Sequence, residues 1–160
     1  MLLVFDLDDT LYGCTGQMKE ATKWEDARRI VPFSGVIELL SSFPAEKILL
    51  SRETDAGLQD IKIDALGIRA YFSKIYLCRK NDEKRGLLEI IKGDYSSEDI
   101  WVVGDRIDSE IQYGNELGLK TVRLRYGKYK DMAPQHEHQQ ARYDITEFSQ
   151  LRPILFDLLK

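Results

Sequence analysis

The chain has 160 residues, of which 43% are apolar and 31% charged, and its formal net charge is −4. This size and composition predict one folded domain over residues 1–160 with a substantial core, and the absence of a basic excess argues against binding of nucleic acid. No apolar run approaches the roughly 20 residues that a membrane helix needs, and the N-terminus lacks the basic and long apolar parts of a signal peptide, so we expect a cytoplasmic protein.

Five short apolar runs are predicted to be strands of a mostly parallel sheet, because near-continuous apolar character is typical of strands covered on both faces. They are residues 2–5, 47–51, 74–78, 100–104 and 120–125. Helical spacing of apolar residues predicts helices within 34–43, 53–68, 81–93 and 108–118, the third of them ending at Gly93. Residues 144–160 read as a short strand or turn followed by a helix. The alternation predicts a doubly wound, Rossmann-like α/β sandwich of three layers.

Polar residues stand at the ends of three predicted strands. Asp6 and Asp8 follow the first strand, Ser51 ends the second and Asp105 follows the fourth. Ligands of open α/β sheets bind beyond the carboxyl ends of the strands, so these groups are expected in one crevice. Clustered carboxylates become favourable when a hard cation neutralises them, and oxygen ligands suit Mg²⁺. The sequence therefore predicts a Mg²⁺ cofactor held by aspartates.

The residue types at these positions suit phosphoryl transfer. An ionised Asp6 beside a cation can attack phosphorus, and Asp8, two residues on, can give a proton to the leaving oxygen and later take one from water. The hydroxyls of Thr10 and Ser51 can hold phosphoryl oxygens. A lysine is also needed, because this chemistry depends mainly on positioning and charge neutralisation.

Three motifs carry a resemblance to a known family. FDLDDT at 5–10, LLSRET at 49–54 and VVGDRIDSEI at 102–111 resemble, in order, the first, second and fourth motifs of the haloacid dehalogenase superfamily, over roughly residues 1–125. Members are mostly Mg²⁺-dependent phosphatases that work through an aspartyl-phosphate. The resemblance implies that Asp6 is the nucleophile and that Asp6, Asp105 and the backbone carbonyl of Asp8 bind the metal.

Two positions depart from the family pattern. The third motif is a lysine usually followed by proline, and this proline is missing here. Both Lys80 and Lys84 are candidates; we favour Lys84 because Leu88 follows it at the family's spacing. Many members carry a second aspartate five residues after the one matching Asp105, where this chain has Glu110. We interpret Glu110 as a group that orients metal-bound water or the lysine.

The chain leaves no room for a large cap domain. Only 40 residues separate Thr10 from Ser51, so the resemblance is to capless members, with a small flap around 12–31. Tyr12 and Trp24 are candidate substrate-facing groups on this flap. A capless site is open, which suggests either a large or protruding substrate or an oligomer, such as a homo-oligomer, that covers it.

We therefore predict a phosphatase acting on a phosphomonoester, with a small phosphorylated molecule as the substrate and a phosphoprotein left open. Arg52, next to Ser51, is assigned to substrate binding, with an ordinary surface arginine as the alternative. Two other functions stay open: a phosphotransferase that uses the same intermediate, and a non-catalytic phosphate-binding or regulatory module. No membrane partner is expected.

Overall fold

The computed structural model describes residues 1–160 and contains one six-stranded sheet in which every neighbouring pair of strands is parallel. The strand order is β3-β2-β1-β4-β5-β6. The predicted doubly wound α/β fold is confirmed. The strands are β1 (Leu2–Phe5), β2 (Glu46–Arg52), β3 (Lys74–Cys78), β4 (Ile100–Gly104), β5 (Lys120–Leu124) and β6 (Tyr143–Ile145).

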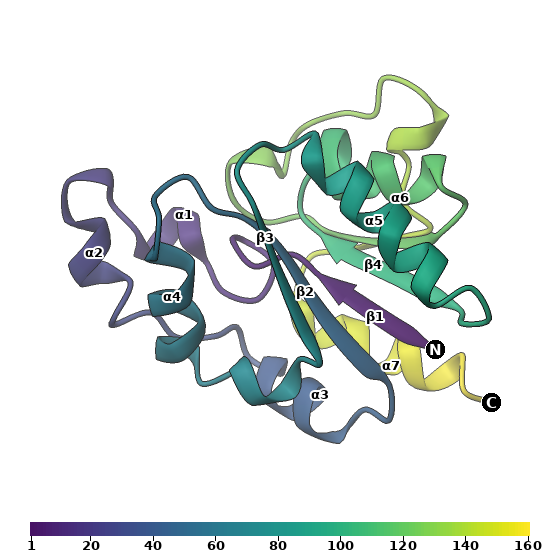
Figure 1. Cartoon of the computed structure of the whole chain (residues 1–160), viewed down its shortest axis with the longest axis horizontal. Coiled ribbons are helices and arrows are strands. Elements are labelled where there is room, and N and C mark those ends of the chain that lie inside the picture. Colours follow the sequence, from purple (N-terminus) through teal and green to yellow (C-terminus); the bar gives the residue numbers. More distant parts are fainter.

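Helices connect the strands and cover both faces of the sheet (Figure 1). The α-helices are α1 (Cys14–Gln17), α2 (Lys23–Asp26), α3 (Val36–Ser42), α4 (Leu58–Leu66), α5 (Glu83–Asp94), α6 (Gln112–Glu116) and α7 (Leu151–Asp157). Short helical turns, mostly of the 3₁₀ type, are η1 (Glu20–Thr22), η2 (Arg69–Tyr71), η3 (Ile107–Ile111), η4 (Gly127–Tyr129), η5 (Glu137–Gln139) and η6 (Phe148–Gln150).

The core lies in two layers because successive side chains of a strand point to opposite faces. Leu3 and Phe5 of β1 join the larger cluster, which includes residues of α3, α4 and α7. Leu2 and Val4 join the smaller cluster, which includes residues of α5 and the end of α6. Strand β1, at the centre of the sheet, is therefore buried on both faces, which explains its continuous apolar sequence.

The strand order places a topological switch point between β1 and β4. The chain moves outward from β1 through β2 to β3 on one side, and from β4 through β5 to β6 on the other. Connections on the two sides therefore leave a crevice beyond the carboxyl ends of β1 and β4, the place where open α/β sheets bind ligands. Asp6 and Asp105 are the first residues after these two strands.

Two helix predictions differ from the structure. Helix α5 passes through Gly93 and ends at Asp94, so this glycine is an interior residue and not the end of the helix. Residues 108–118 do not form one regular helix: η3 is a π-helical turn with Ser109 at φ −133° and ψ −113°, and α6 begins only at Gln112. A wide turn of this kind often occurs at functional sites, where it redirects a side chain.

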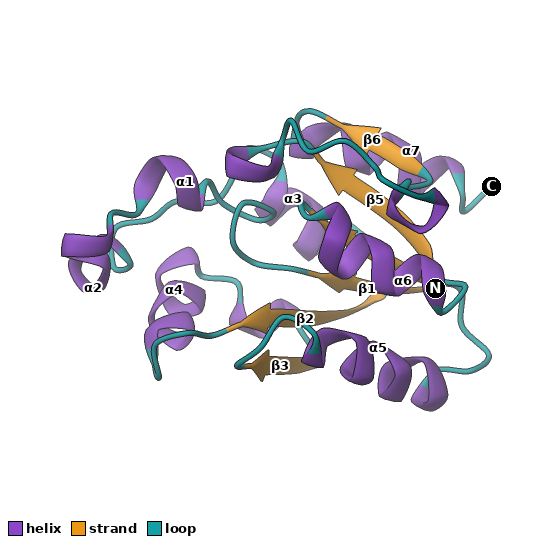
Figure 2. Ribbon diagram, turned by 90° about the horizontal axis from the view of Figure 1, so that it is seen from above, coloured by secondary structure: helices purple, strands orange, loops and turns teal.

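The segment 12–31 projects beyond the carboxyl ends of the strands (Figure 2). An antiparallel bridge between Tyr12 and Pro32 closes its base, and Lys23 pairs with Asp55 of the β2–α4 loop at 2.9 Å. Trp24 is 40% exposed. Tyr12 is fully buried and packs in the larger core cluster. The prediction that its ring faces the substrate is therefore wrong.

No helix combines the length and the apolar character required to cross a bilayer.

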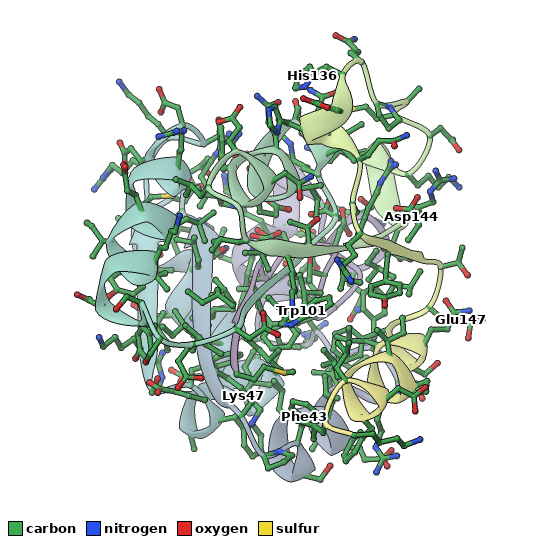
Figure 3. The ribbon with its side chains drawn as sticks, turned by 90° about the vertical axis from the view of Figure 1, so that its right-hand side faces the viewer. Phe43, Lys47, Trp101, His136, Asp144 and Glu147 are labelled. Atoms are coloured by element: carbon green, nitrogen blue, oxygen red, sulfur yellow. The ribbon has the colours of Figure 1, made fainter.

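Figure 3 shows His136 at the outer edge of the molecule, on the polar excursion between β5 and β6, and Lys47 beside Phe43 at the opposite end. The buried ammonium of Lys47 donates hydrogen bonds to the backbone carbonyls of Phe43 and Ala45, both at 2.8 Å.

Candidate functional site

Asp6 is held at the end of β1 by the sheet itself. Its backbone N–H donates to the carbonyl of Val103 in β4 at 3.0 Å, which continues the parallel ladder by one residue. The carboxylate is 8% exposed and accepts a hydrogen bond from the Lys84 ammonium at 2.9 Å. Burial raises the pKa of Asp6 to about 6, because the attraction of Lys84 only partly offsets the loss of water and the repulsion of Glu110 and Asp8.

A cluster of three acids surrounds this position. One carboxylate oxygen from each of Asp6, Asp105 and Glu110 lies within 4.8 Å of the other two, and all three residues are buried. Burial and the charges of Glu110 and Asp6 raise the pKa of Asp105 well above its ordinary value. Lys84 is the only ammonium that bonds to this cluster, so the three acids carry more negative charge than the protein neutralises when all are ionised.

Lys84 joins two of these acids from helix α5. It is 4% exposed and donates to Asp6 at 2.9 Å and to Glu110 at 3.2 Å. Burial alone would lower its pKa, but the two carboxylates outweigh burial and raise the pKa above its ordinary value, so the amine stays charged. Lys80 is exposed on the turn before α5 and makes no side-chain contact with the cluster.

Glu110 fixes both the lysine and the loop after β4. One of its oxygens accepts the backbone N–H groups of Asp105 and Arg106, both at 3.1 Å, and the other accepts Lys84. Burial would raise the pKa of Glu110, but Lys84 and the backbone donor of Arg106 keep it below its ordinary value. The wide turn η3 is what brings this carboxylate inward, and a side chain on Gly104 would collide with it.

The carboxylate of Asp8 lies outside the three-acid cluster. We had expected the carboxylates of Asp6, Asp8 and Asp105 to meet around one ion, but Glu110 takes the third place. It accepts three hydrogen bonds from the other side: from Tyr12 at 2.5 Å, Lys62 at 2.8 Å and Gln59 at 3.1 Å. Burial would raise the pKa of Asp8, but the charge of Lys62 and the donated bonds hold it below its ordinary value. Any part of Asp8 in holding a metal therefore rests on its backbone carbonyl.

The two predicted phosphate-binding hydroxyls are both buried. The Thr10 hydroxyl lies 3.4 Å from Asp6 and 3.5 Å from Asp105, which are long distances for hydrogen bonds. The Ser51 hydroxyl accepts a hydrogen bond of 2.8 Å from Gln59. Arg52 is exposed at the end of β2, and no hydrogen bond or ion pair occupies its guanidinium.

Asp9 shapes the start of the projecting segment and does not contact the acid cluster. Its backbone has φ 57°, a left-handed conformation. Its carboxylate accepts the backbone N–H and the hydroxyl of Thr15 at 2.8 and 2.6 Å. Gly127 packs against the same carboxylate so closely that a side chain there would collide with Asp9. Asp9 therefore anchors the first turn of α1 to the loop after β5.

These residues open onto a cleft of about 440 Å³. Its lining is mainly polar and comes from both sides of the switch point and from the segment 12–31. The lining residues are Asp6, Asp8, Asp9, Cys14, Thr15, Met18, Lys19, Glu20, Lys23, Arg52, Thr54, Asp55, Leu58, Gln59, Lys62, Asn81, Lys84, Asp105, Arg106, Lys128 and Tyr129. Thr10, Ser51 and Glu110 lie behind this lining. Such a cleft suits a small polar ligand with anionic groups.

Gln59 and Lys62 were not predicted as site residues, and the structure places both on the buried face of α4. A signal was present: both fall at helical spacing with the buried Leu58, Ile63 and Leu66. Polar residues on an otherwise apolar helix face need buried partners, which here are Asp8 and Ser51.

The donor set fits a hard divalent cation. The cluster offers carboxylate oxygens, the neighbouring hydroxyl of Thr10 is also an oxygen ligand, and the excess negative charge described above favours a cation. No histidine or cysteine belongs to the cluster, which separates it from typical zinc or copper sites.

Sequence comparison places this chain near archaeal phosphatases. Residues 81–151 match the HAD-hydrolase-like family model. The glyceraldehyde 3-phosphate phosphatase of Methanocaldococcus jannaschii is 31% identical over 137 residues, which are 81% of this chain and 58% of that protein. The glyceraldehyde 3-phosphate phosphatase of Methanopyrus kandleri is 29% identical over 62% of this chain and 45% of its own length. The chain thus spans about half the length of these curated relatives.

Structural comparison finds the same fold in distant sequences. D,D-heptose 1.7-bisphosphate phosphatase from B. bronchiseptica, solved with magnesium and phosphate, superposes with a TM-score of 0.74 at 16% identity, covering 98% of both chains. L-2-haloacid dehalogenase from Xanthobacter autotrophicus superposes with a TM-score of 0.71 at 9% identity, covering 97% of this chain and 98% of the other. These two structures share the fold, and the matches to the family model and to the Methanocaldococcus jannaschii phosphatase show that this chain belongs to the haloacid dehalogenase-like superfamily.

Proposed function

We propose that this chain is a Mg²⁺-dependent phosphatase that hydrolyses a phosphomonoester through an aspartyl-phosphate on Asp6. The observation that carries the proposal is the arrangement at the switch point. A buried Asp6 carboxylate lies 2.9 Å from Lys84, within 4.8 Å of Asp105 and Glu110, at the floor of a polar cleft. This arrangement combines a nucleophile, a fixed positive charge and a cation site in one place.

In the first half-reaction a carboxylate oxygen of Asp6 attacks phosphorus while the bond to the leaving oxygen breaks. The leaving alkoxide takes a proton from Asp8, which lines the same cleft. Lys84, which already donates to Asp6, can donate to the phosphoryl oxygens as negative charge develops on them. The buried hydroxyls of Thr10 and Ser51 are further hydrogen-bond donors beneath the floor of the cleft. Arg52 contacts the part of the substrate nearer the cleft mouth.

In the second half-reaction water attacks the same phosphorus, and the bond between phosphorus and the Asp6 oxygen breaks. Asp8, now ionised, takes the proton of the attacking water. Phosphate leaves, Asp6 is a free carboxylate again, and Asp8 again carries the proton with which it began the first half-reaction. Glu110 keeps Lys84 and the loop after β4 in position throughout, because its two oxygens hold both.

The residues that would hold Mg²⁺ are Asp6, Asp105 and the backbone carbonyl of Asp8. Bound there, the ion supplies neutralisation of the clustered carboxylates and of the negative charge of the phosphoryl group. Glu110 stays with its lysine and backbone partners in this assignment.

The cleft supports a small phosphorylated molecule as the substrate. Its volume of about 440 Å³ and its polar lining suit a phosphorylated metabolite of a few carbon atoms, and glyceraldehyde 3-phosphate, named in the relatives, is the first compound to test. The segment 12–31 acts as a small flap in this proposal, since Cys14, Lys19 and Lys23 from it line the cleft. No larger cap is inserted between β1 and β2.

The test is phosphate release from glyceraldehyde 3-phosphate and from an aryl phosphate, with Mg²⁺ and with a chelator, by the wild type and by Asp6→Asn. We expect Mg²⁺-dependent release by the wild type and none by Asp6→Asn. Asp64→Asn is the matched control, because Asp64 is an exposed aspartate that pairs only with Arg69. Substantial activity of Asp6→Asn would contradict the proposal, and phosphate transfer to an added alcohol in place of release would identify a phosphotransferase.

A further inference from the structure

We propose that Tyr12, Gln59 and Lys62 form a clasp that positions Asp8 for proton transfer, with Lys62 as its main member. This inference rests on the proposed phosphatase function, within which it assigns roles to three residues outside the motifs. We call this set the Asp8 clasp. Two of its members come from one face of α4, three residues apart, and the third comes from the loop after β1.

The clasp treats the two oxygens of Asp8 differently. Oδ1 accepts the charged donor Lys62 at 2.8 Å and the hydroxyl of Tyr12 at 2.5 Å. Oδ2 accepts only the neutral amide of Gln59, at 3.1 Å. Charge-assisted bonds are the stronger ones, so Oδ1 is the anchored oxygen and Oδ2 is the oxygen left to carry the proton.

Gln59 is suited to a carboxyl group that changes its protonation. Its Nε2 donates both to Asp8 and to the hydroxyl oxygen of Ser51, at 3.1 and 2.8 Å. An amide that rotates by half a turn presents its oxygen at the same place, where it can accept from a protonated Asp8 and from the Ser51 hydroxyl. Gln59 can therefore remain bonded to both residues in either half-reaction, and it ties the proton-transfer group to the predicted phosphate-binding hydroxyl.

The burial of Lys62 indicates that its role is to position Asp8 and not only to stabilise the fold. Lys62 is 4% exposed, and its ammonium has one carboxylate partner, Asp8, whose side chain is 34% exposed in the cleft. A buried charge of this kind is a weak source of stability, because an apolar side chain at the same place often stabilises as well or better. Lys47 shows the contrast, since its ammonium is also buried but donates only to the backbone carbonyls of Phe43 and Ala45, away from the cleft.

The inference makes a selective kinetic prediction. An alkoxide leaving group needs a proton from Asp8, whereas p-nitrophenolate is a weak base that departs without one. The parameter kcat/KM reports the first half-reaction, so a misplaced Asp8 should lower kcat/KM for glyceraldehyde 3-phosphate and spare kcat/KM for p-nitrophenyl phosphate. A general fault in folding or in phosphate binding would lower both.

The experiment measures both kcat/KM values for the wild type, Lys62→Met, Lys62→Arg and Tyr12→Phe, with Lys47→Met as the control buried lysine. We expect Lys62→Met to lose about 10- to 100-fold with the alkyl phosphate, part of the roughly 10²–10⁴-fold that a general acid contributes, and under threefold with the aryl phosphate. Lys62→Arg should recover part of the loss. Tyr12→Phe, which removes one hydroxyl, should show the same selectivity to a smaller degree, and Lys47→Met should show none.

A double-mutant cycle closes the test. In an Asp8→Asn background, Lys62→Met should cause no further loss with the alkyl phosphate, because its effect passes through Asp8. Equal losses with both substrates, or additive losses in the cycle, would overturn the inference while leaving the phosphatase proposal standing. If Lys62→Met does not fold, Tyr12→Phe and Gln59→Leu decide by the same selectivity. A wild type that hydrolyses neither compound would instead contradict the phosphatase proposal itself.

Discussion

Lys84 in α5 and Asp6 at the end of β1 are 78 residues apart in sequence and form a buried ion pair with a distance of 2.9 Å. The pair exists because Leu88 and Ile91, one and two turns further along α5, pack against the sheet in the smaller core cluster. Packing of this helix therefore delivers the positive charge to the floor of the cleft. The candidate site depends on core residues that never touch a substrate.

Replacing Lys84 should damage both activity and stability. Lys84→Met leaves Asp6 and Glu110 buried without a positive partner, and breaking a buried pair in this way costs about 3–5 kcal/mol of unfolding free energy. We expect phosphatase activity to fall at least about 100-fold, the scale of losing one electrostatic donor. Urea unfolding and phosphate release measure the two effects. Lys80→Met, four residues earlier and exposed, should change neither, and equal effects of the two substitutions would contradict the assignment of Lys84.

Replacing Asp105 should stabilise the metal-free protein. Burial and the neighbouring acids raise the pKa of Asp105 well above its ordinary value, so ionising it costs more in the folded than in the unfolded chain. A carboxyl with a raised folded pKa contributes stability at low pH that is lost as the pH rises. With a chelator present, Asp105→Asn should therefore be more stable than the wild type by on the order of 1 kcal/mol or more near neutral pH, and the gain should shrink as the pH falls towards the ordinary pKa of about 4 and be absent below it.

Magnesium should reverse this order. A ligand at a hundredfold excess over its Kd stabilises the folded state by about 2.7 kcal/mol, so Mg²⁺ should raise the unfolding free energy of the wild type. Asp105→Asn should respond little, since one of its cation ligands is gone. Urea unfolding with and without Mg²⁺ measures both responses, and an equal response of the two proteins would argue against Asp105 as a ligand.

Much of the fold was predictable because its strands are apolar almost without interruption. Each of the five predicted strands occurs within one residue of its expected ends, since strands buried on both faces leave a clear pattern. The convergence of Asp6 and Asp105 followed from the rule for strand ends in such sheets. The choice of Lys84 over Lys80 required a motif resemblance, because both lysines fall at helical spacing with Leu88.

The features that the sequence did not predict depend on single side chains whose long-range contacts outweigh the local preference for a regular helix. Residues 108–118 have the pattern of one helix, but the structure has the wide turn η3 there, from which the carboxylate of Glu110 accepts hydrogen bonds from the backbone of Asp105 and Arg106. Helical spacing places Gln59 and Lys62 on the buried face of α4, but it does not identify their partner Asp8, over fifty residues earlier. The spacing of one segment does not show which distant residue a buried polar side chain meets.

Two glycines in helices should respond in opposite ways to alanine. A methyl group on Gly114 in α6 would lie 2.9 Å from Thr121 and 3.4 Å from Val102, so Gly114→Ala should destabilise the protein by about 1–3 kcal/mol through overpacking. Gly86 in α5 has nothing within 4 Å of that position. Gly86→Ala should therefore stabilise by about 0.5–1 kcal/mol through helix propensity. Thermal and urea unfolding decide, and a stabilising Gly114→Ala would show that α6 lies further from β4 and β5.

Cys14 should react slowly with alkylating agents in the folded protein. Burial in the cleft wall and the charge of Asp8 raise the pKa of its thiol to about 11, and only the thiolate reacts. At about pH 8 the folded protein should label Cys14 roughly a hundredfold more slowly than the urea-unfolded chain, in line with the smaller thiolate fraction. Mass spectrometry of the N-terminal peptide follows the label, and equal rates in the two states would contradict this environment.

The most direct test of the central claim is chemical capture of phosphate on Asp6. Enzyme mixed with substrate and Mg²⁺ is quenched in acid during turnover and treated with borohydride, which reduces an aspartyl-phosphate to homoserine. The tryptic peptide of residues 1–19 contains Asp6, Asp8 and Asp9, and fragment masses show which of them has changed. The account predicts homoserine at position 6 alone. Turnover without homoserine at that position, or with the change at another aspartate, would contradict it.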